Sequence, residues 1–174
     1  GELGKKGYYT AFFHGADNGS MGFEAFARTA GYTHYFGRTE YNEANPDNKD
    51  FDGHWGIWDE KFFQFFGNTL SGFQQPFAAA LFSLSSHHPF AVPAEYEGVF
   101  PKGNKPIRQC IGYTDNALKL FFEKVSKEPW YKNTLFVFTA DHTNSPERPE
   151  YETESGLFSV PVVFYQPGSD LKGF

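Results

Sequence analysis

Short apolar runs alternate along the chain with segments in which apolar residues recur at helical spacing. The continuous apolar and β-branched runs predict strands over residues 8–13, 33–36, 77–84, 134–140 and 160–165. Helical spacing predicts helices over residues 20–30 and 60–66, and a helix of about 20 residues that starts at Ile107 and ends before Pro129. Helices that alternate with buried strands indicate an α/β domain with a mostly parallel sheet.

Polar stretches and helix-end signals separate these elements. The segment over residues 39–52 is rich in Asn and Asp and has no regular period, which predicts a long surface loop. Asp59 is predicted to cap the helix over residues 60–66, and Gly67 is predicted to end it.

The apolar run over residues 77–84 leaves one alternative open. Its alanines allow a helix, but residues 85–89 break the run sharply, and this break favours a strand. The run is far shorter than the roughly 20 apolar residues that span a bilayer. The first residues also lack the apolar region of a signal peptide. The sequence therefore predicts a chain without a membrane span.

Charge and composition narrow the classes of function. Lys and Arg total 15 against 21 Asp and Glu, and the net charge of -6 argues against a nucleic-acid partner, which needs a basic face. Aromatic residues make up 20% of the chain, so disorder is not expected. Cys110 is the single cysteine, which excludes an internal disulfide and a multi-cysteine zinc site. Its expected role is packing.

Polar side chains that can carry chemistry follow three of the predicted strands. His14, His87 and the pair Asp141–His142 each come just after a strand. In open α/β sheets, ligands bind at the carboxyl ends of the strands, so we expect these residues to converge on one crevice. A carboxylate beside an imidazole suits zinc or manganese. The alternative is that Asp141 caps a turn while His142 packs at the surface.

The other candidates each allow a functional and an ordinary interpretation. His87 suits an anionic oxygen or a metal, or it is an ordinary loop histidine. His14 contacts a substrate, or it only hydrogen-bonds the backbone at a strand end. The helix start near Ser20 offers free N–H groups that favour an anion at this edge. Trp55 and Trp58 line a subsite for a sugar or lipid headgroup, or they belong to the core.

Several short sequence motifs, taken together and in order, are far more specific than any one of them. They are Phe13-His14-Gly15 with Gly31-Tyr32, Leu84 to Phe90, Tyr113 to Leu118, Phe138 to Asn144, and Val160 to Gly168. In this order they resemble the alkaline phosphatase and sulfatase superfamily, and within it the lipoteichoic-acid-synthase-like branch. The resemblance implies a three-layer αβα fold of the alkaline phosphatase type with a mostly parallel sheet. Residues 1–174 would form the carboxyl-terminal part of the catalytic domain.

The resemblance also implies a role for each candidate residue. Asp141 and His142 would be ligands of a catalytic divalent metal, Mn²⁺ or Zn²⁺, whose other ligands lie outside this chain. His87 would be catalytic, binding the phosphate or sulfate group under attack, and His14 would line the substrate pocket. A metal that stabilises developing charge and an imidazole that neutralises a non-bridging oxygen form a consistent mechanism.

The activity that the resemblance implies is phosphoryl or phosphoglycerol transfer, or phosphodiester hydrolysis, on an extracytoplasmic phosphoester or glycan substrate. The enzyme would be held in the membrane by amino-terminal helices that this chain lacks. The nucleophile would lie in the missing amino-terminal part of the same domain. The chain alone is therefore expected to be inactive.

Two departures from the family pattern keep alternatives open. Where the lipoteichoic acid synthases have a Trp and an Arg that hold glycerophosphate, this chain has Met21 and Phe23. The Cys-x-Pro-x-Arg motif of sulfatases is absent, since Cys110 is followed by Ile111 and Gly112. A sulfatase that acts on sulfated glycans is the alternative enzyme. A non-catalytic binding module is the alternative from another class.

Overall fold

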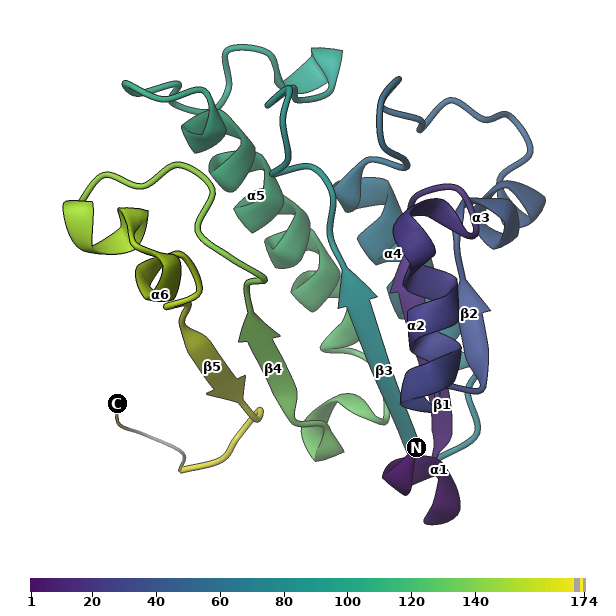
Figure 1. Cartoon of the computed structure of the whole chain (residues 1–174). Coiled ribbons are helices and arrows are strands. Elements are labelled where there is room, and N and C mark those ends of the chain that lie inside the picture. The colour runs from purple at the N-terminus through teal and green to yellow at the C-terminus, as the bar shows by residue number, and fades with distance from the viewer. Residues whose placement is uncertain (171–172, 174) are drawn as a thin grey trace. The chain divides into compact units, whose positions relative to one another are not determined.

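The computed structural model of the chain describes residues 1–170 and 173 and divides into two compact units, Gly1–Lys124 and Val125–Phe174 (Figure 1). The elements of the first unit are α1 (Glu2–Lys5), β1 (Tyr9–His14), η1 (Ser20–Gly22), α2 (Phe23–Ala30), β2 (His34–Phe36), α3 (Arg38–Ala44), α4 (Asp59–Ser71), β3 (Phe77–Phe82), η2 (Ala94–Tyr96) and α5 (Ile107–Val125), whose last residue opens the second unit. The elements of the second unit are η3 (Tyr131–Asn133), β4 (Phe136–Thr139), η4 (Pro149–Glu152), α6 (Glu154–Leu157) and β5 (Val162–Tyr165).

Three parallel strands form the sheet of the first unit, in the order β2-β1-β3. β1 pairs with β3 along its whole length, from Tyr9 opposite Phe77 to His14 opposite Phe82. The strand predicted over residues 77–84 is therefore confirmed. Parallel strands combined with helices also confirm the predicted α/β class.

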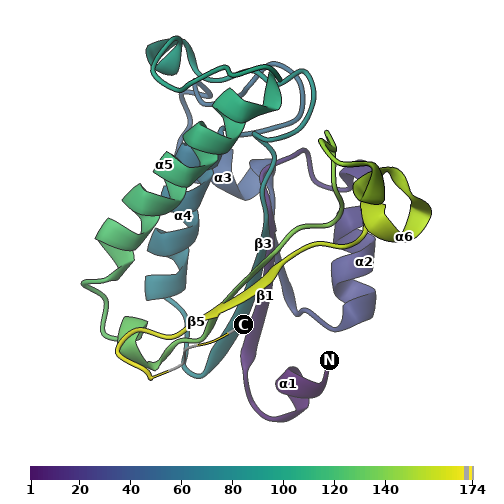
Figure 2. The same cartoon turned by 90° about the vertical axis from the view of Figure 1, so that its left-hand side faces the viewer.

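Helices cover both faces of this sheet. Figure 2 shows α4 and α5 on one side of β1 and β3, with α2 on the other side. Successive side chains of a strand point to opposite faces, so β1 supplies both layers. The Phe13 ring lies 4.6 Å from that of Phe36 and 4.7 Å from that of Phe66 on α4. Phe12 faces the other way and clusters with the buried Ala27 of α2. The first unit is therefore a three-layer αβα arrangement.

Helix α5 buries one stripe of side chains and confirms the longest predicted helix. Four residues one helical turn apart are all buried: Tyr113, Ala117, Phe121 and Val125. Cys110 heads the same stripe and is 0% exposed. Burial, with a smaller contribution from the charge of Asp59, raises the pKa of the Cys110 thiol to about 11. Cys110 is therefore an unreactive packing residue, as predicted.

Helix α3 occupies the start of the segment predicted as a loop over residues 39–52, so that prediction is wrong in part. The first turn of α3 is held by the Glu40 carboxylate. It accepts hydrogen bonds from the backbone N–H of Gly37 at 2.6 Å and from the Asn18 side chain at 3.0 Å. Asn18 lies 22 residues earlier in the chain. A hydrogen bond between residues so far apart in the chain cannot be predicted from the local sequence pattern, so the helix was not expected.

Helix α4 is longer than predicted, and Asp59 does not cap it. Trp58 takes the N-cap position, while Asp59 is the first helical residue and is buried. Gly67, predicted to end the helix, lies inside it and is buried as well. The Phe66 ring stacks on that of Phe121 of α5 with 5.7 Å between centroids. Packing against α5 therefore outweighs the low helix propensity of glycine.

The second unit contains an antiparallel pair of strands, β4 and β5. Phe136 lies opposite Tyr165, and Thr139 lies opposite Val162. Both strands are predicted from the sequence, at slightly wider bounds. Their antiparallel pairing departs from the parallel arrangement of the first unit. Within residues 1–170 and 173, every helix is too short or too polar to cross a bilayer.

Candidate active site

His14 and His87, two of the predicted site residues, lie on segments that meet at one edge of the sheet, at the carboxyl ends of β1 and β3. His14 is the last residue of β1 and lies opposite Phe82, the last residue of β3. Because these strands are parallel, the chain leaves the sheet at the same edge after each of them. His87 follows β3 in a turn in which its N–H donates to the Leu84 carbonyl at 3.0 Å.

A segment around Gly56 runs across this edge. The N–H of Ile57 donates to the Gly15 carbonyl at 3.0 Å, and Ala16 pairs with Gly56 in an antiparallel bridge. No larger residue fits at position 56. A Cβ atom there would lie 2.3 Å from the Gly15 oxygen and 2.7 Å from Cδ1 of Leu84. The glycine therefore lets this segment lie directly against the ends of both strands.

The exposed side chain of His87 is oriented by its neighbours. Its Nδ1 lies 3.0 Å from the carbonyl oxygen of His88. A carbonyl only accepts hydrogen bonds, so Nδ1 carries a proton and Nε2 is left for an outside partner. The Trp55 indole meets the imidazole edge-on at 4.4 Å and donates its Nε1–H to the same carbonyl. The His88 ring packs against Phe90 instead, at 5.7 Å. Both rings are exposed, but of the two it is His87 whose ring is oriented by the His88 carbonyl and the Trp55 indole.

His14 is buried and electrically neutral. It is 1% exposed, its ring centroid lies 4.1 Å from that of Phe23, and its Nδ1 lies 3.5 Å from the Tyr35 hydroxyl. Burial lowers the pKa of His14 to about 4, so the imidazole carries no charge at neutral pH. At a substrate it would act as an uncharged hydrogen-bonding group. The sequence assignment of His14 to a substrate pocket stays a prediction.

The buried neutral His14 predicts a loss of stability in acid. The pKa is about 4 in the folded state against 6.5 for an unperturbed histidine, so the unfolded state binds the proton first as the pH falls. The contribution of neutral His14 to the free energy of unfolding is fully present above pH 6.5 and is lost as the pH falls towards 4. Between pH 7 and pH 5, the His14→Phe variant should lose roughly 1–2 kcal/mol less than the unmodified protein. Urea denaturation at each pH measures this. Parallel pH profiles of the two proteins would contradict it, and His34→Phe, at an exposed position, is the control.

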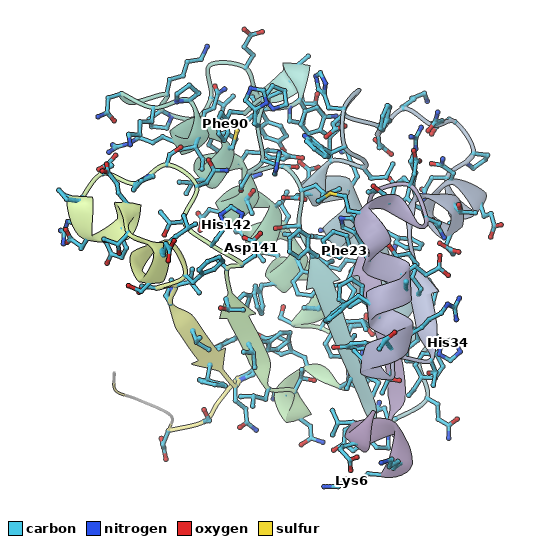
Figure 3. The ribbon with its side chains drawn as sticks, in the orientation of Figure 1. Lys6, Phe23, His34, Phe90, Asp141 and His142 are labelled. Atoms are coloured by element: carbon cyan, nitrogen blue, oxygen red, sulfur yellow. The ribbon has the colours of Figure 1, made fainter. Side chains whose placement is uncertain are left out.

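Asp141 and His142 are adjacent candidate metal ligands in the loop after β4. Figure 3 labels both residues. The N–H of His142 donates to Oδ1 of Asp141 at 2.9 Å, which turns the carboxylate towards the imidazole. Nδ1 of His142 lies 3.0 Å from the Thr143 carbonyl oxygen, so Nδ1 holds the proton and Nε2 keeps its lone pair. Both side chains are open to solvent, at 43% and 54% for His142 and Asp141.

The spacing of this pair fits one divalent ion. Two N or O ligands at about 2.0–2.2 Å from a zinc ion, at the tetrahedral angle, lie roughly 3.4 Å apart. Nε2 of His142 and Oδ2 of Asp141 are separated by 3.4 Å. The alternative, in which Asp141 caps a turn and His142 packs at the surface, stays open, since Oδ1 of Asp141 accepts the N–H of His142. Among residues 1–170 and 173, no group of three or more His, Cys, Asp or Glu side chains is arranged around a common metal position.

The structure brings the candidates together in two sets. The segments of His14 and His87 share one edge of the sheet in the first unit, while Asp141 and His142 adjoin each other in the second. Their convergence on a single crevice stays a prediction.

Comparison with known proteins assigns the chain to a family. The family model for sulfatases matches residues 3–172. The chain belongs to the sulfatase family. The match runs through both compact units and includes every residue proposed from the sequence as part of a site.

The relatives of this sulfatase-family chain include a protein named as lipoteichoic acid synthase-like and a phosphoglycerol transferase. The lipoteichoic acid synthase-like protein YvgJ of Bacillus subtilis is 26% identical over 78% of this chain and 22% of its own length. Phosphoglycerol transferase I of Escherichia coli is 26% identical over 80% of this chain and 19% of its own length. The chain thus spans about a fifth of these relatives. A solved structure from the alkaline phosphatase superfamily of Vibrio parahaemolyticus has the same fold, with a TM-score of 0.77 and 24% identity over 95% of this chain and 40% of that one.

Two apolar residues, Met21 and Phe23, stand where the lipoteichoic acid synthases are expected to have a Trp and an Arg. Met21 is 74% exposed and adopts φ 49°, in the left-handed region that non-glycine residues rarely occupy. Phe23 packs between His14 and Phe82, with 4.8 Å between the rings of Phe23 and Phe82. The helix predicted from about Ser20 begins as the 3₁₀ turn η1 and becomes α-helical only at Phe23.

The structure separates the two tryptophans that the sequence leaves equivalent. Trp55 contacts His87, whereas Trp58 meets Tyr113 of α5 edge-on at 6.1 Å. Asp59, beside Trp58, is a buried residue near this edge whose role the sequence pattern does not indicate. Its only sequence signal is a carboxylate at the start of an aromatic helix, which is also what a cap looks like.

Proposed function

We propose that the chain is the carboxyl-terminal part of the catalytic domain of a metal-dependent enzyme that transfers or hydrolyses a phosphoester. The observation that carries this proposal is the spacing of Asp141 and His142, which fits two ligands of one ion. The sulfatase family match and the synthase-like and transferase names of the relatives support phosphoryl or phosphoglycerol transfer as the reaction. The substrate would be an anionic glycerophosphate-type or glycan ester.

A divalent ion, Mn²⁺ or Zn²⁺, held by Asp141 and His142 would stabilise charge that develops on the phosphate and lower the pKa of the attacking group. With both ring nitrogens protonated, the His87 imidazolium would donate from Nε2–H to a non-bridging oxygen of the phosphate. Its Nδ1–H stays bound to the His88 carbonyl, so the ring keeps one orientation while Nε2 meets the substrate. Such a donor costs little reorganisation as negative charge builds up on the oxygen.

The rest of the catalytic apparatus belongs, in this proposal, to another part of the parent protein. The chain covers 22% and 19% of the two relatives named above. We therefore assign the nucleophile and the remaining metal ligands to the parts not covered, and we expect this chain alone to be inactive. By the same resemblance, the parent protein would be anchored in the membrane and act on its extracytoplasmic side.

The test is a comparison of two substrates with the purified parent protein. A glycerophosphate diester and an aryl sulfate are supplied in parallel, with Mn²⁺ or Zn²⁺ and after treatment with EDTA. We expect turnover of the phosphodiester, loss of that turnover with EDTA, and recovery when the metal is restored. Hydrolysis of the sulfate ester alone would identify a sulfatase instead. Turnover of neither substrate, without metal binding, would identify a non-catalytic module.

A further inference from the structure

A buried carboxylate of the first unit holds the turn that carries His87. Asp59, the first residue of α4, is 2% exposed. Its Oδ1 accepts the backbone N–H of Leu84 at 2.8 Å, and its Oδ2 accepts the backbone N–H of Ser85 at 3.1 Å. In return, the N–H of Asp59 donates to the Ser85 hydroxyl oxygen at 3.0 Å. The start of α4 and the end of the β3 segment are therefore joined by three hydrogen bonds.

The chemistry of these bonds explains why an acid is needed at this position. Leu84 and Ser85 are buried but lie beyond the end of β3, so their N–H groups have no partner in the sheet. An unpaired N–H in the interior costs free energy, and two consecutive N–H groups need two acceptor atoms side by side. A carboxylate supplies both. Burial raises the pKa of Asp59 to about 6, and its hydrogen bonds oppose that rise, so the group is mostly ionised at neutral pH.

Helix α5 closes the same network from the other side. The Thr114 hydroxyl donates to Oδ2 of Asp59 at 3.3 Å and lies 3.2 Å from the Ser86 hydroxyl. The neighbouring Tyr113 hydroxyl accepts the N–H of Glu60 at 3.2 Å. The sequence block from Tyr113 to Leu118, which no candidate catalytic role uses, therefore anchors both α4 and the turn after β3.

The His87 turn is thus held on the side that precedes His87 and by a bond within the turn itself. On the near side, Asp59 and Thr114 hold the backbone and side chains of the three residues that precede His87. Within the turn, the N–H of His87 donates to the Leu84 carbonyl, the residue whose own N–H binds Asp59. We propose that Asp59 is a positioning residue for His87, which aligns Nε2 of His87 with the phosphate by holding the Leu84–Ser85 backbone. This inference rests on the proposed function, because it assigns the phosphate to His87.

The first test replaces Asp59 by asparagine in the parent protein. Asparagine keeps the shape and one acceptor oxygen but turns an NH₂ group towards one of the two backbone N–H groups. We expect kcat for the phosphodiester to fall by about 100-fold, as for misplacement of a catalytic group by about 1 Å. KM should change by less than about threefold, because the phosphate is still bound by the metal and the rest of the site. The metal content should stay the same.

The decisive measurement is the same substitution in the absence of His87. A residue that acts through His87 has nothing left to position in a His87→Ala protein, so adding Asp59→Asn should lower kcat by less than about twofold. A residue that only supports the fold would lower kcat as strongly in both backgrounds. An equal loss in the two backgrounds would therefore overturn the proposal.

Two further variants guard against a misfolded protein. Thr114→Val leaves the Asp59 carboxylate and its two bonds to backbone N–H groups in place and removes one hydroxyl. We expect kcat to fall by only about 3–10-fold, and we expect no effect when His87 is absent.

Asp50→Asn is the control for the Asp59→Asn change. It makes the same acid-to-amide replacement at a carboxylate that accepts the Tyr41 hydroxyl at 2.6 Å, and it should leave kcat unchanged. A loss in Asp50→Asn equal to that in Asp59→Asn would overturn the specific role of Asp59.

A measurement that needs no turnover separates this inference from the proposed function. In Asp59→Asn, amide hydrogen exchange at Leu84 and Ser85 should accelerate by about 10-fold or more, while exchange in the centre of α5 stays as it was. Unchanged exchange at Leu84 and Ser85 would overturn the positioning role, whether or not the protein turns over a phosphoester. Accelerated exchange in a protein without phosphoester turnover would remove the proposed function only.

Discussion

In the proposed metal-dependent enzyme, replacement of Asp141 by alanine is expected to prevent binding of the divalent metal and to remove nearly all turnover of phosphoesters. Oδ2 of the Asp141 carboxylate lies 3.4 Å from Nε2 of the His142 imidazole, a spacing that suits two ligands of one ion. Loss of either donor should weaken metal binding by about 100-fold or more, since even changes around a ligand cost 10–100-fold. A bound metal would contribute several kcal/mol to the transition state, so turnover in the proposed enzyme should fall roughly 1,000-fold.

Isothermal titration with Mn²⁺ and Zn²⁺, together with metal analysis of the purified protein, measures the first effect. Glu150→Gln is a matched control in the same unit, because Glu150 is an exposed carboxylate that lies 3.9 Å from Arg148 rather than beside His142. His142→Ala should behave like Asp141→Ala. Full metal occupancy in Asp141→Ala would show that this pair does not hold the ion.

Replacement of His87 by alanine should lower turnover by about 100- to 1,000-fold and leave the metal content unchanged. This is the range expected for removal of one preorganised donor to a developing oxyanion. The structure leaves Nε2 of His87 free for such a bond, because Nδ1 is engaged by the His88 carbonyl. Steady-state kinetics on the phosphodiester, with metal analysis of the same preparation, measures both quantities.

The neighbouring histidine provides the control for this prediction. His88→Ala keeps the carbonyl that accepts from Nδ1 of His87 and from Trp55, and it removes only a ring that packs on Phe90. We expect its kcat to stay within about threefold of the unmodified value. Equal losses in the two variants would mean that the pair acts through packing of the loop and not through His87.

The sequence by itself predicts the elements whose signal is local. The apolar run over residues 77–84 forms strand β3. The segment with helical spacing that starts at Ile107 forms helix α5. Continuous apolar character and helical spacing are properties of neighbouring residues, so they can be read without the fold. The order of the motif blocks indicates the superfamily, which the match over residues 3–172 confirms.

The tertiary structure decides everything that depends on residues far apart in the chain. Asp59 reads as a helix cap in the sequence, but its carboxylate binds backbone groups 25 and 26 residues later and a hydroxyl 55 residues later. His14 reads as a polar strand end, but packing against Phe23 removes it from water and holds its pKa near 4.

The same distinction applies to choices between similar residues. Trp55 and Trp58 carry the same local signal, yet of the two only Trp55 contacts His87. The reason is that the segment around Gly56 is hydrogen-bonded to Gly15 and packs closely against the end of β1. The sequence determined which residue types stand after each strand. The long-range hydrogen bonds and ring contacts of the folded chain decided which of them are buried, which are charged and which are open to solvent. Desolvation and hydrogen-bond geometry depend on all the surroundings of a side chain, not only on its neighbours in sequence.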